Sequence, residues 1–381
     1  MDFEFSEEQE MVRAMAREFT DEAVRPLVES IEENHQVPRE LLEQMAELGL
    51  MGIAIPEAYG GAGLGETGLC IVMEELTRGC FSTAATYGAH TSIGATSVEV
   101  GGSEEQKARF LPPMAAGEVL GAFALTESNA GSDPAAMATT AVRDGDEWVI
   151  NGEKIWITAG DIAGLTTVFA VTDREAGVKG LSAIMVPAGT PGFTVGKREE
   201  KMGQRGSSTV TLVLEDVRVP ADHLLGTPGS GFSVAMKTLD RGRLAIGANC
   251  LGCGREALAL SRAFSQEREA FGKPIASQQA IQWMLADSAT ELYAMESMIY
   301  RAAWMCDTGR PFSRESAATK LFASEALDRI VDRGVQIHGG MGYSAECAIE
   351  RLYRDARVTR IYEGTSEIQR LVLARDVLKN G

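Results

Sequence analysis

The chain has 381 residues and a mass of 40.8 kDa, which is more than one ordinary hydrophobic core accommodates, so we expect two or three domains. Asp plus Glu total 54 against 36 Lys plus Arg, and the resulting formal charge of −18 disfavours binding to nucleic acid. No apolar run approaches the roughly 20 residues that a membrane span needs. The first residues are acidic rather than basic or Arg-rich, so we expect no signal or transit peptide and a cytoplasmic location.

Residues 1–120 have a helical pattern, which predicts an N-terminal α-helical domain. Ser6 and Gln9 have the spacing of a capping box, where a helix starts. Pro38 is typical of a second helix start. A third helix is predicted through residues 71–76.

Two small-residue motifs raise ligand-binding alternatives. The loop 59–65 is glycine-rich, but a dinucleotide fingerprint requires a surrounding βαβ unit, so a connecting loop between helices is favoured. Cys250 and Cys253 have metal-type spacing, yet no second pair or nearby His completes a tetrahedral site. We therefore predict a closely packed helix there and no metal.

Residues 121–230 change to a period of two, which predicts a β-domain, either a small barrel or a sandwich. Asn151 and Gly152 separate two alternating runs within 147–158, and this dipeptide predicts a hairpin turn. Further strands are predicted over residues 168–171, 181–186 and 210–214.

Residues 231–381 return to the helical period over long stretches such as 281–299 and 321–330. We expect a C-terminal domain of the four-helix-bundle type that also carries the catalytic loop. The order of helices, strands and helices predicts an α+β fold in which a β-domain lies between two helical domains, and not a Rossmann sheet.

The β-segment contains two patches that suit a flat or anionic ligand. Residues 123–133 supply hydroxyl donors and approachable backbone N–H groups, although an ordinary turn explains them as well. Trp156 at a strand end is commonly part of a core. The alternative is a plate that stacks on a flavin ring, with Thr158 bonding the edge of the ring.

The C-terminal segment contains two more patches. In 336–342, Gly339 and Gly340 could be a helix C-cap, and His338 is expected to be structural. Ser366 and Gln369 have the spacing of an N-cap and its N3 partner, which predicts a helix start.

Glu363 lies just before this helix, on a connection made flexible by Gly364. The free N–H groups of the helix could hold its carboxylate as a structural acid. Alternatively, the carboxylate faces a cavity and acts as a base that an apolar substrate dehydrates.

These four patches, in this order and spacing, resemble the acyl-CoA dehydrogenase family over nearly the whole chain. The most specific stretches are 125–133 and 336–346, which Arg351 and Asp355 follow, while 361–370 matches the catalytic loop of the family. The resemblance implies FAD-dependent α,β-dehydrogenation of a short- to medium-chain acyl-CoA, straight or branched, to trans-2-enoyl-CoA. It also implies a homotetramer in which FAD crosses a subunit interface, with an electron-transferring flavoprotein as the electron acceptor.

The resemblance assigns the cofactor contacts by position. Around the flavin ring and its pyrophosphate it places Phe123, Leu125, Thr126, Gly131, Ser132, Trp156, Ile157 and Thr158. Across the subunit interface it places Arg268, Phe271, Gln279, Gln336, Gly339 and Gly340. Thr365 and Glu367 would close over the cofactor.

In the resemblance, Glu363 is the catalytic base that removes the α-proton of the substrate, and the flavin accepts the β-hydrogen as hydride. A dry cavity would raise the pKa of this carboxylate, and the Glu363 N–H would help to polarise the thioester oxygen. The implied substrate contacts are Ser132, Asp240, Arg243, Tyr362 and Gly364.

Gly242 refines the assignment. In isovaleryl- and long-chain-type members the base occupies this position, so a glycine here and an acid at 363 resemble the short- and medium-chain arrangement. Residues 86–93 offer no Arg for a second carboxylate, so a glutaryl-type substrate is not expected. An acyl-CoA oxidase on the same fold and a non-catalytic assembly partner stay open as alternatives.

Overall fold

The N-terminal helices begin where the sequence places their caps. In this computed structural model, which describes residues 4–380, α1 (Glu7–Phe19) starts after Ser6, whose Oγ accepts the Gln9 N–H at 3.2 Å while Ser6 N donates to Gln9 Oε1 at 3.0 Å. The predicted capping box is confirmed. Pro38 precedes α3 (Arg39–Glu47), also as expected. The other elements here are α2 (Val28–Asn34), α4 (Gly65–Gly79), α5 (Phe81–Gly88), the π-helix η5 (Ala89–Ala95), α6 (Thr96–Gly101) and α7 (Glu104–Ala115).

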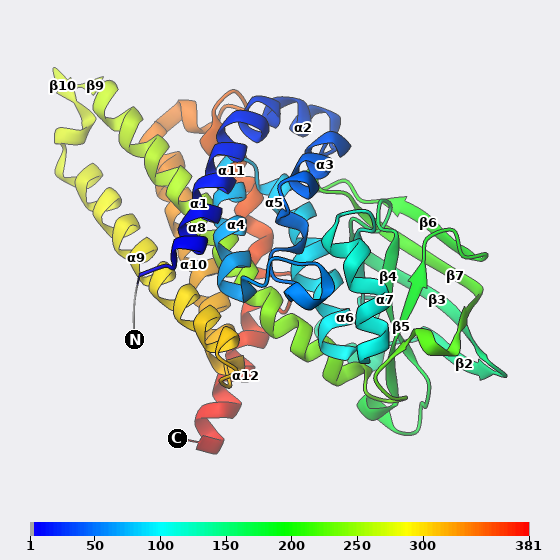
Figure 1. Ribbon diagram of the computed structural model, residues 1–381. Coiled ribbons are helices and arrows are strands. Elements are labelled where there is room, and N and C mark those ends of the chain that lie inside the picture. Colours follow the sequence, from blue (N-terminus) through cyan, green and yellow to red (C-terminus); the bar gives the residue numbers. More distant parts are fainter. Residues whose placement is uncertain (1–3, 381) are drawn as a thin grey trace.

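The middle of the chain folds into an eight-stranded sheet at one end of the molecule (Figure 1). Its strands are β1 (Gly121–Ala124), β2 (Thr140–Asp144), β3 (Glu147–Thr158), β4 (Leu165–Val171), β5 (Leu181–Pro187), β6 (Phe193–Arg198), β7 (Thr209–Pro220) and β8 (Leu224–Leu225). The order is β6-β7-β3-β2-β4-β5-β8, and β1 pairs in parallel with β4. β4 and β5 are buried along nearly their whole length. Apolar side chains of these two strands share one core cluster with apolar side chains of α6, α7 and α8.

The predicted hairpin at Asn151 and Gly152 is wrong, because β3 runs unbroken through both residues. The turn lies instead at residues 145–146, between paired strands β2 and β3. At Gly152 the β3–β7 register shifts, and a Cβ there would lie 2.4 Å from Thr139 Oγ1. Asn151 Oδ1 accepts the Asp216 N–H at 2.8 Å. The Asn-Gly pair therefore marks a bulge with close chain contact rather than a turn.

The C-terminal region is a packed set of long helices, as expected (Figure 1). They are α8 (Gly231–Glu267), α9 (Gln279–Asp307), α10 (Ser313–His338), the shorter α11 (Ala348–Ala356) and α12 (Ser366–Asn380). A small hairpin of β9 (Glu269–Ala270) and β10 (Lys273–Pro274) joins α8 to α9 and projects at the end far from the sheet (Figure 1). The α+β class with helices on both sides of a β-region in sequence is confirmed. We retain domain boundaries near residues 120 and 230 as a proposal.

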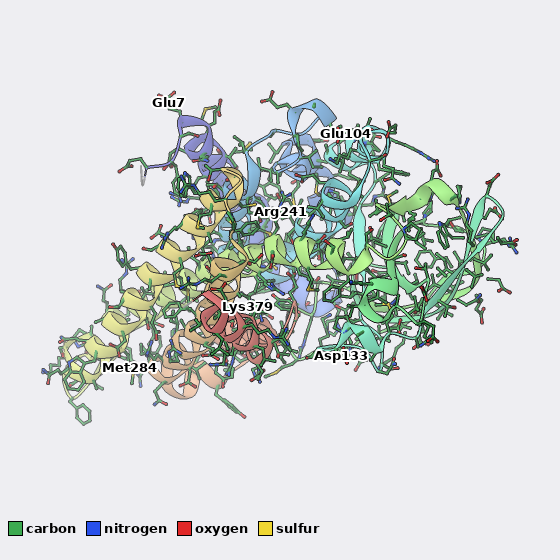
Figure 2. The ribbon with its side chains drawn as sticks, turned by 90° about the horizontal axis from the view of Figure 1, so that it is seen from below. Glu7, Glu104, Asp133, Arg241, Met284 and Lys379 are labelled. Atoms are coloured by element: carbon green, nitrogen blue, oxygen red, sulfur yellow. The ribbon has the colours of Figure 1, made fainter. Side chains whose placement is uncertain are left out.

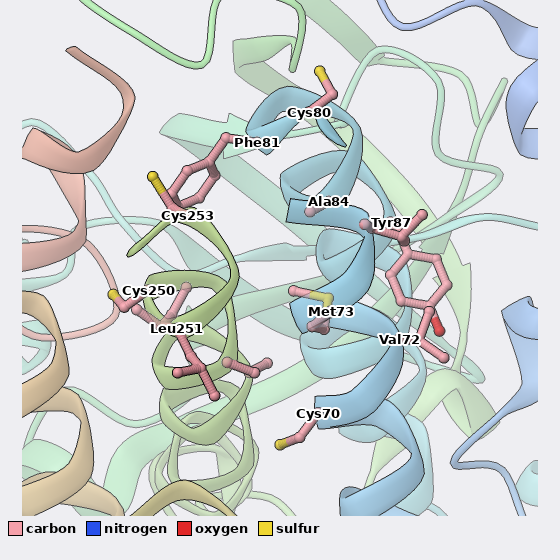
Figure 3. Close-up of a cluster of buried hydrophobic side chains, with 14 of the residues drawn as sticks. Cys70, Val72, Met73, Cys80, Phe81, Ala84, Tyr87, Cys250, Leu251 and Cys253 are labelled. Carbon is pink, nitrogen blue, oxygen red and sulfur yellow. The ribbon is translucent and has the colours of Figure 1, made fainter. Parts of the chain in front are cut away.

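The cysteine pair belongs to the core. Cys250 and Cys253 are free, fully buried thiols on α8, within a cluster that includes side chains of α4 and α5 (Figure 3). A Cβ at Gly252 would lie 2.2 Å from the Glu74 carbonyl oxygen, so small residues let α8 approach α4 closely. Within residues 4–380 there is no group of three or more potential metal ligands. No helix in the same range is long and apolar enough to cross a membrane.

Candidate active site

Glu363 lies on a strained connection between η11 (Arg357–Arg360) and α12. Its φ is 52° and that of Gly364 is 93°, so two successive residues adopt positive φ. This conformation is uncommon for a residue with a Cβ, costs about 1–3 kcal/mol, and persists only where surrounding contacts hold it. The backbone thus points to a functional site at Glu363.

Three side chains from three helices hold this connection by its carbonyl groups. Gln369 Nε2 donates to the Gly364 carbonyl at 2.9 Å and, more weakly, to that of Glu363 at 3.3 Å. Lys320 Nζ donates to the Gly364 carbonyl at 2.7 Å, and Arg243 Nε reaches the Glu363 carbonyl at 3.5 Å. The sequence analysis did not identify Lys320, whose polar contact is made only by folding.

The predicted N-cap at Ser366 is displaced by one residue. Ser366 is the first residue of α12, and Thr365 Oγ1 accepts the Ile368 N–H at 3.3 Å in the capping position. The Gln369 side chain therefore holds the preceding loop and does not complete a capping box. The helix start itself is confirmed.

The Glu363 carboxylate lies against the backbone of α8. A Cβ added at Gly242 would lie 2.2 Å from Glu363 Oε2 and 3.0 Å from Ile93 Cγ2. The carboxylate therefore occupies the space that a side chain at 242 would fill. This overlap gives a physical reason why an acid at 363 goes with glycine at 242.

Glu363 Oε2 is buried and has no hydrogen-bond partner in the part of the chain that the structure describes. Burial raises the pKa of Glu363 to about 7, against the opposing charges of Lys320 and Arg243. A carboxylate with one buried oxygen that makes no hydrogen bond, and with a pKa near 7, is suited to accept a proton. The alternative of a structural acid held by the N–H groups of α12 has no hydrogen bond to support it among residues 4–380.

Arg243 is a buried residue and not an exposed helix arginine. Only 4% of its surface is exposed, and its Nη1 donates to Asp240 Oδ1 at 2.6 Å. Asp240 also accepts a hydrogen bond from the Ser313 hydroxyl of α10. The pair ties α8 to α10 directly beside the Glu363 loop.

The loop after β1 is joined to β3 next to Trp156. Ile155 N donates to the Thr126 carbonyl at 2.9 Å, and Lys154 Nζ donates to the Leu125 carbonyl at 3.2 Å. The β3–β7 register shifts between 154 and 157, and Trp156 has a φ of 61° with 54% of its surface exposed. The indole is therefore presented outward and is not part of the core.

The structure also reveals a buried ion pair that the sequence analysis missed. Glu127 Oε1 accepts from Lys154 Nζ at 2.7 Å and from the Thr139 N–H at 3.0 Å, while Oε2 accepts the Ala138 N–H at 2.6 Å. The Lys154 side chain is fully buried. A lysine on the inward face of an alternating strand was the available clue.

Glu127→Ala is expected to lower the free energy of unfolding by about 3–5 kcal/mol, because it leaves the Lys154 ammonium buried and unpaired. Urea unfolding at pH 7 measures the loss. The double variant Glu127→Ala, Lys154→Met removes both charges and should recover much of the stability. A single variant within 1 kcal/mol of the parent, roughly, would contradict this role.

The π-helix η5 lies between the Glu363 carboxylate and the start of β1 and contacts residues on both sides. Ile93 faces the position of Gly242, and the backbone of Gly94 approaches Gly121 so closely that a Cβ would lie 2.7 Å from its carbonyl carbon. His90 Nδ1 accepts the Gly121 N–H at 2.9 Å, and its Nε2 donates to the Met114 carbonyl at 3.1 Å. One buried element thus fixes the base relative to the strand that leads into the Thr126 loop.

The remaining predicted cofactor residues lie elsewhere in the chain. Arg268 is the C-cap residue of α8, Phe271 lies in the turn of the projecting hairpin and Gln279 begins α9; the Phe271 side chain is 94% exposed. Figure 2 shows Met284 of α9 near the left end of the molecule and Asp133 of the Thr126 loop to the right of the centre, on the side of the sheet. The β9–β10 hairpin lies at the end of the molecule far from the sheet whose strand β3 carries Trp156 (Figure 1).

The end of α10 adjoins this second group. The His338 ring stacks on Phe264 near the end of α8, with centroids 4.4 Å apart, and its Nδ1 bonds the Gly334 carbonyl at 2.7 Å, so His338 is structural as predicted. Gly339 is the C-cap of α10 with a φ of 59°. A Cβ at Gly339 or Gly340 would meet nothing within 4 Å, so both backbones are accessible.

The order of helices, sheet and helices, the exposed Trp156 indole at a strand end and the Glu363 carboxylate beside Gly242 suit a protein that stacks a flat ligand and uses a carboxylate base. Family models match residues 6–118 as the N-terminal domain, 122–217 as the middle domain and 229–378 as the C-terminal domain of acyl-CoA dehydrogenase. The chain therefore belongs to the acyl-CoA dehydrogenase family, and the predicted resemblance is confirmed.

Relatives match this chain over its full length. It is 47% identical to the probable acyl-CoA dehydrogenase YngJ of Bacillus subtilis, with 100% of both chains covered. It is 46% identical to the acryloyl-CoA reductase (NADH) of Anaerotignum propionicum, covering 100% of this chain and 96% of the relative. The structure of butyryl-CoA dehydrogenase from Megasphaera elsdenii aligns with a TM-score of 0.97 at 39% identity, covering 99% and 100%.

Proposed function

We propose that this protein dehydrogenates short-chain acyl-CoA esters to trans-2-enoyl-CoA, with Glu363 as the base and FAD as the cofactor of the family. The observation that carries the proposal is Glu363 Oε2, a buried carboxylate oxygen that lies against Gly242 and has no hydrogen-bond partner among residues 4–380. The butyryl-CoA dehydrogenase structure favours a short acyl chain.

The chemistry of the predicted contacts fits FAD. The exposed Trp156 indole offers a stacking face, and the Thr126 and Thr158 hydroxyls offer hydrogen bonds at the edge of a flat ring. Gly131 has nothing within 4 Å of a Cβ position, and Ser132 is exposed, so this backbone is open to a phosphate. Phe123 is buried in one core cluster with Leu125 packed against it, and Ile157 is buried in another, so we assign all three to the cofactor site by the position of their backbones beside the proposed ring.

The residues of this chain have distinct tasks in the proposed reaction. Glu363 accepts the α-proton of the thioester into its ionised carboxylate, and Gly242 leaves room for that carboxylate. Gln369 and Lys320 hold the carbonyl groups that orient it. When bound, FAD supplies the acceptor for the hydride that leaves the β-carbon. Loss of the proton and the hydride leaves the new carbon–carbon double bond.

The substrate contacts stay proposals at this site. Tyr362 and Gly364 flank the base, and Arg243 and Asp240 lie on the adjoining face of α8. Because Arg243 is paired and buried, we assign it to shaping the site next to the thioester rather than to capturing a free anion. Ser132 is exposed on the cofactor loop, within the proposed entrance.

We further propose that a second subunit completes the cofactor site in a homotetramer. Arg268, Phe271 and Gln279 lie at the end of the molecule far from the sheet that carries Trp156, and the almost fully exposed Phe271 offers an apolar contact to a second subunit. Gln336, Gly339 and Gly340 adjoin the same group. Thr365 caps α12 and Glu367 is in its first turn, and the exposed Glu367 carboxylate is available to a ligand. An electron-transferring flavoprotein as acceptor and the cytoplasmic location also stay predictions.

The function is tested by anaerobic titration of the purified flavoprotein with butyryl-CoA and longer acyl-CoAs, with the visible flavin absorbance as readout. Butyryl-CoA is expected to bleach the flavin at stoichiometric amounts. Bleaching by no saturated acyl-CoA would reject the proposal. Rapid reoxidation of the reduced flavin by air would favour an oxidase. Faster turnover of acryloyl-CoA with a reduced electron-transferring flavoprotein would favour the reductase direction, in which Glu363 returns the proton to the α-carbon.

The rate of flavin reduction is expected to rise with pH along a limb centred near pH 7, because Glu363 accepts a proton only when ionised and burial raises its pKa to about 7. Stopped-flow bleaching under subsaturating butyryl-CoA, from about pH 5 to about pH 9, reports this limb for the free enzyme. A flat profile over that range would contradict the assignment.

A further inference from the structure

Lys320 is a fully buried lysine that lies beneath the Glu363 loop. It is on α10 with 0% of its surface exposed, and its ammonium donates to the Gly364 carbonyl at 2.7 Å. Removing an ammonium from water costs several kcal/mol, and this one is hydrogen-bonded to a neutral carbonyl rather than to a carboxylate. A charge retained at this cost next to a catalytic loop requires a functional reason.

The charge of Lys320 acts on Glu363. Burial raises the pKa of Glu363, and the largest opposing influence is the positive charge of Lys320, ahead of that of Arg243. Burial also lowers the pKa of Lys320 to about 8, so its ammonium stays mainly protonated at neutral pH. The two groups therefore influence each other through space without a direct bond.

We propose that Lys320 is the positioning residue of the base: its buried ammonium holds the strained Glu363–Gly364 backbone through the Gly364 carbonyl and presents its positive charge to the Glu363 carboxylate. The proposal rests on the proposed function of Glu363. A direct ion pair would occupy the lone pairs that must accept the proton. Because Lys320 is bonded to the carbonyl instead, the base gains a favourable field and keeps its lone pairs free.

Gln369 provides a matched comparison, because it donates to the same Gly364 carbonyl at 2.9 Å but carries no charge. Removing the Gln369 amide takes away one hydrogen bond to the Gly364 carbonyl but leaves the positive charge of Lys320 near Glu363. Removing the Lys320 ammonium takes away both a hydrogen bond to this carbonyl and the positive charge. Other ionisable groups around the two residues come from α4, α8, α12 and the Glu363 loop and stay in place in every variant: Glu66, Asp240, Arg243, Cys250, Tyr362 and Glu367.

The test compares Lys320→Met, Lys320→Arg and Gln369→Leu in the holoenzyme, by the pH dependence of flavin reduction with butyryl-CoA. In Lys320→Met the midpoint of the rising limb is expected to shift to a pH higher by about one unit. At pH values below the midpoint, the rate of flavin reduction is then roughly tenfold lower than in the parent. Lys320→Arg keeps a positive charge and should return the limb towards that of the parent. Gln369→Leu should lower the plateau rate and leave the limb in place.

An unmoved limb in a folded, flavin-loaded Lys320→Met protein would overturn the proposal. The same holds if Gln369→Leu shifts the limb as far as Lys320→Met. If Lys320→Met does not retain flavin, Lys320→Gln serves in its place, judged by the same limb. Glu363→Gln distinguishes the proposed function from the proposed role of Lys320. Turnover in Glu363→Gln rejects the proposed function, whereas an unmoved limb in the Lys320 variants alone rejects only the role of Lys320.

Discussion

Glu363→Gln is expected to lower the rate of flavin reduction by butyryl-CoA by at least roughly 10²–10⁴-fold, because the amide cannot accept the α-proton. The substitution keeps the size and shape of the side chain, so the loop held by Gln369 and Lys320 should be undisturbed. Anaerobic stopped-flow bleaching measures the rate. Near-parental reduction would place the base elsewhere.

The stability of this variant is its control. Because the pKa of Glu363 is raised from about 4.5 to about 7, the folded protein binds more protons than the unfolded chain between these values. The ionised carboxylate therefore lowers the free energy of unfolding as pH rises through this window, and a neutral Gln does not. We expect Glu363→Gln to melt no lower than the parent at about pH 8 and to retain its flavin spectrum, so that lost turnover reports chemistry.

Gly242→Ala is expected to reduce turnover by roughly 100-fold, the effect that a displacement of about 1 Å has on a reacting group. The added Cβ would lie 2.2 Å from Glu363 Oε2, so the carboxylate must move. Folding should suffer little, because Ala favours a helix by about 1 kcal/mol over Gly, and both close contacts, with Glu363 Oε2 and with Ile93 Cγ2 at 3.0 Å, are with side-chain atoms and not with backbone. Steady-state kinetics with butyryl-CoA and thermal melting measure the two effects.

Gly247→Ala is the matched control on the same helix. Its added Cβ would meet Thr319 Cγ2 at 3.0 Å and Ile299 Cγ1 at 3.1 Å, away from the base. We expect a small change in melting temperature and turnover within about twofold of the parent, well below the loss at Gly242. Equal losses in both variants would mean that helix packing, and not the position of the carboxylate, accounts for the effect at 242.

Local patterns predicted the elements whose formation depends on neighbours in sequence. The Ser6 capping box and the Pro38 helix start are confirmed because a cap is made by residues three or four apart. The Asn151–Gly152 hairpin was wrong because a tertiary partner, Asp216 on β7, holds Asn151 within a continuous strand. The same dipeptide suits a turn and a bulge, and pairing with β7 decides between them.

The sequence by itself determined the family, the α+β order of helices and strands, and Glu363 with Gly242 as the residues to compare. The tertiary structure alone decided that their side-chain positions overlap in space, that Trp156 is exposed, and that Lys154 and Lys320 are buried with their partners. These facts depend on contacts between residues far apart in the chain, such as Lys320 with Gly364 and Glu127 with Lys154. Periodicity and capping describe neighbours in sequence, whereas the dehydration that sets the pKa of Glu363 is made by packing α8, α10 and the loop together.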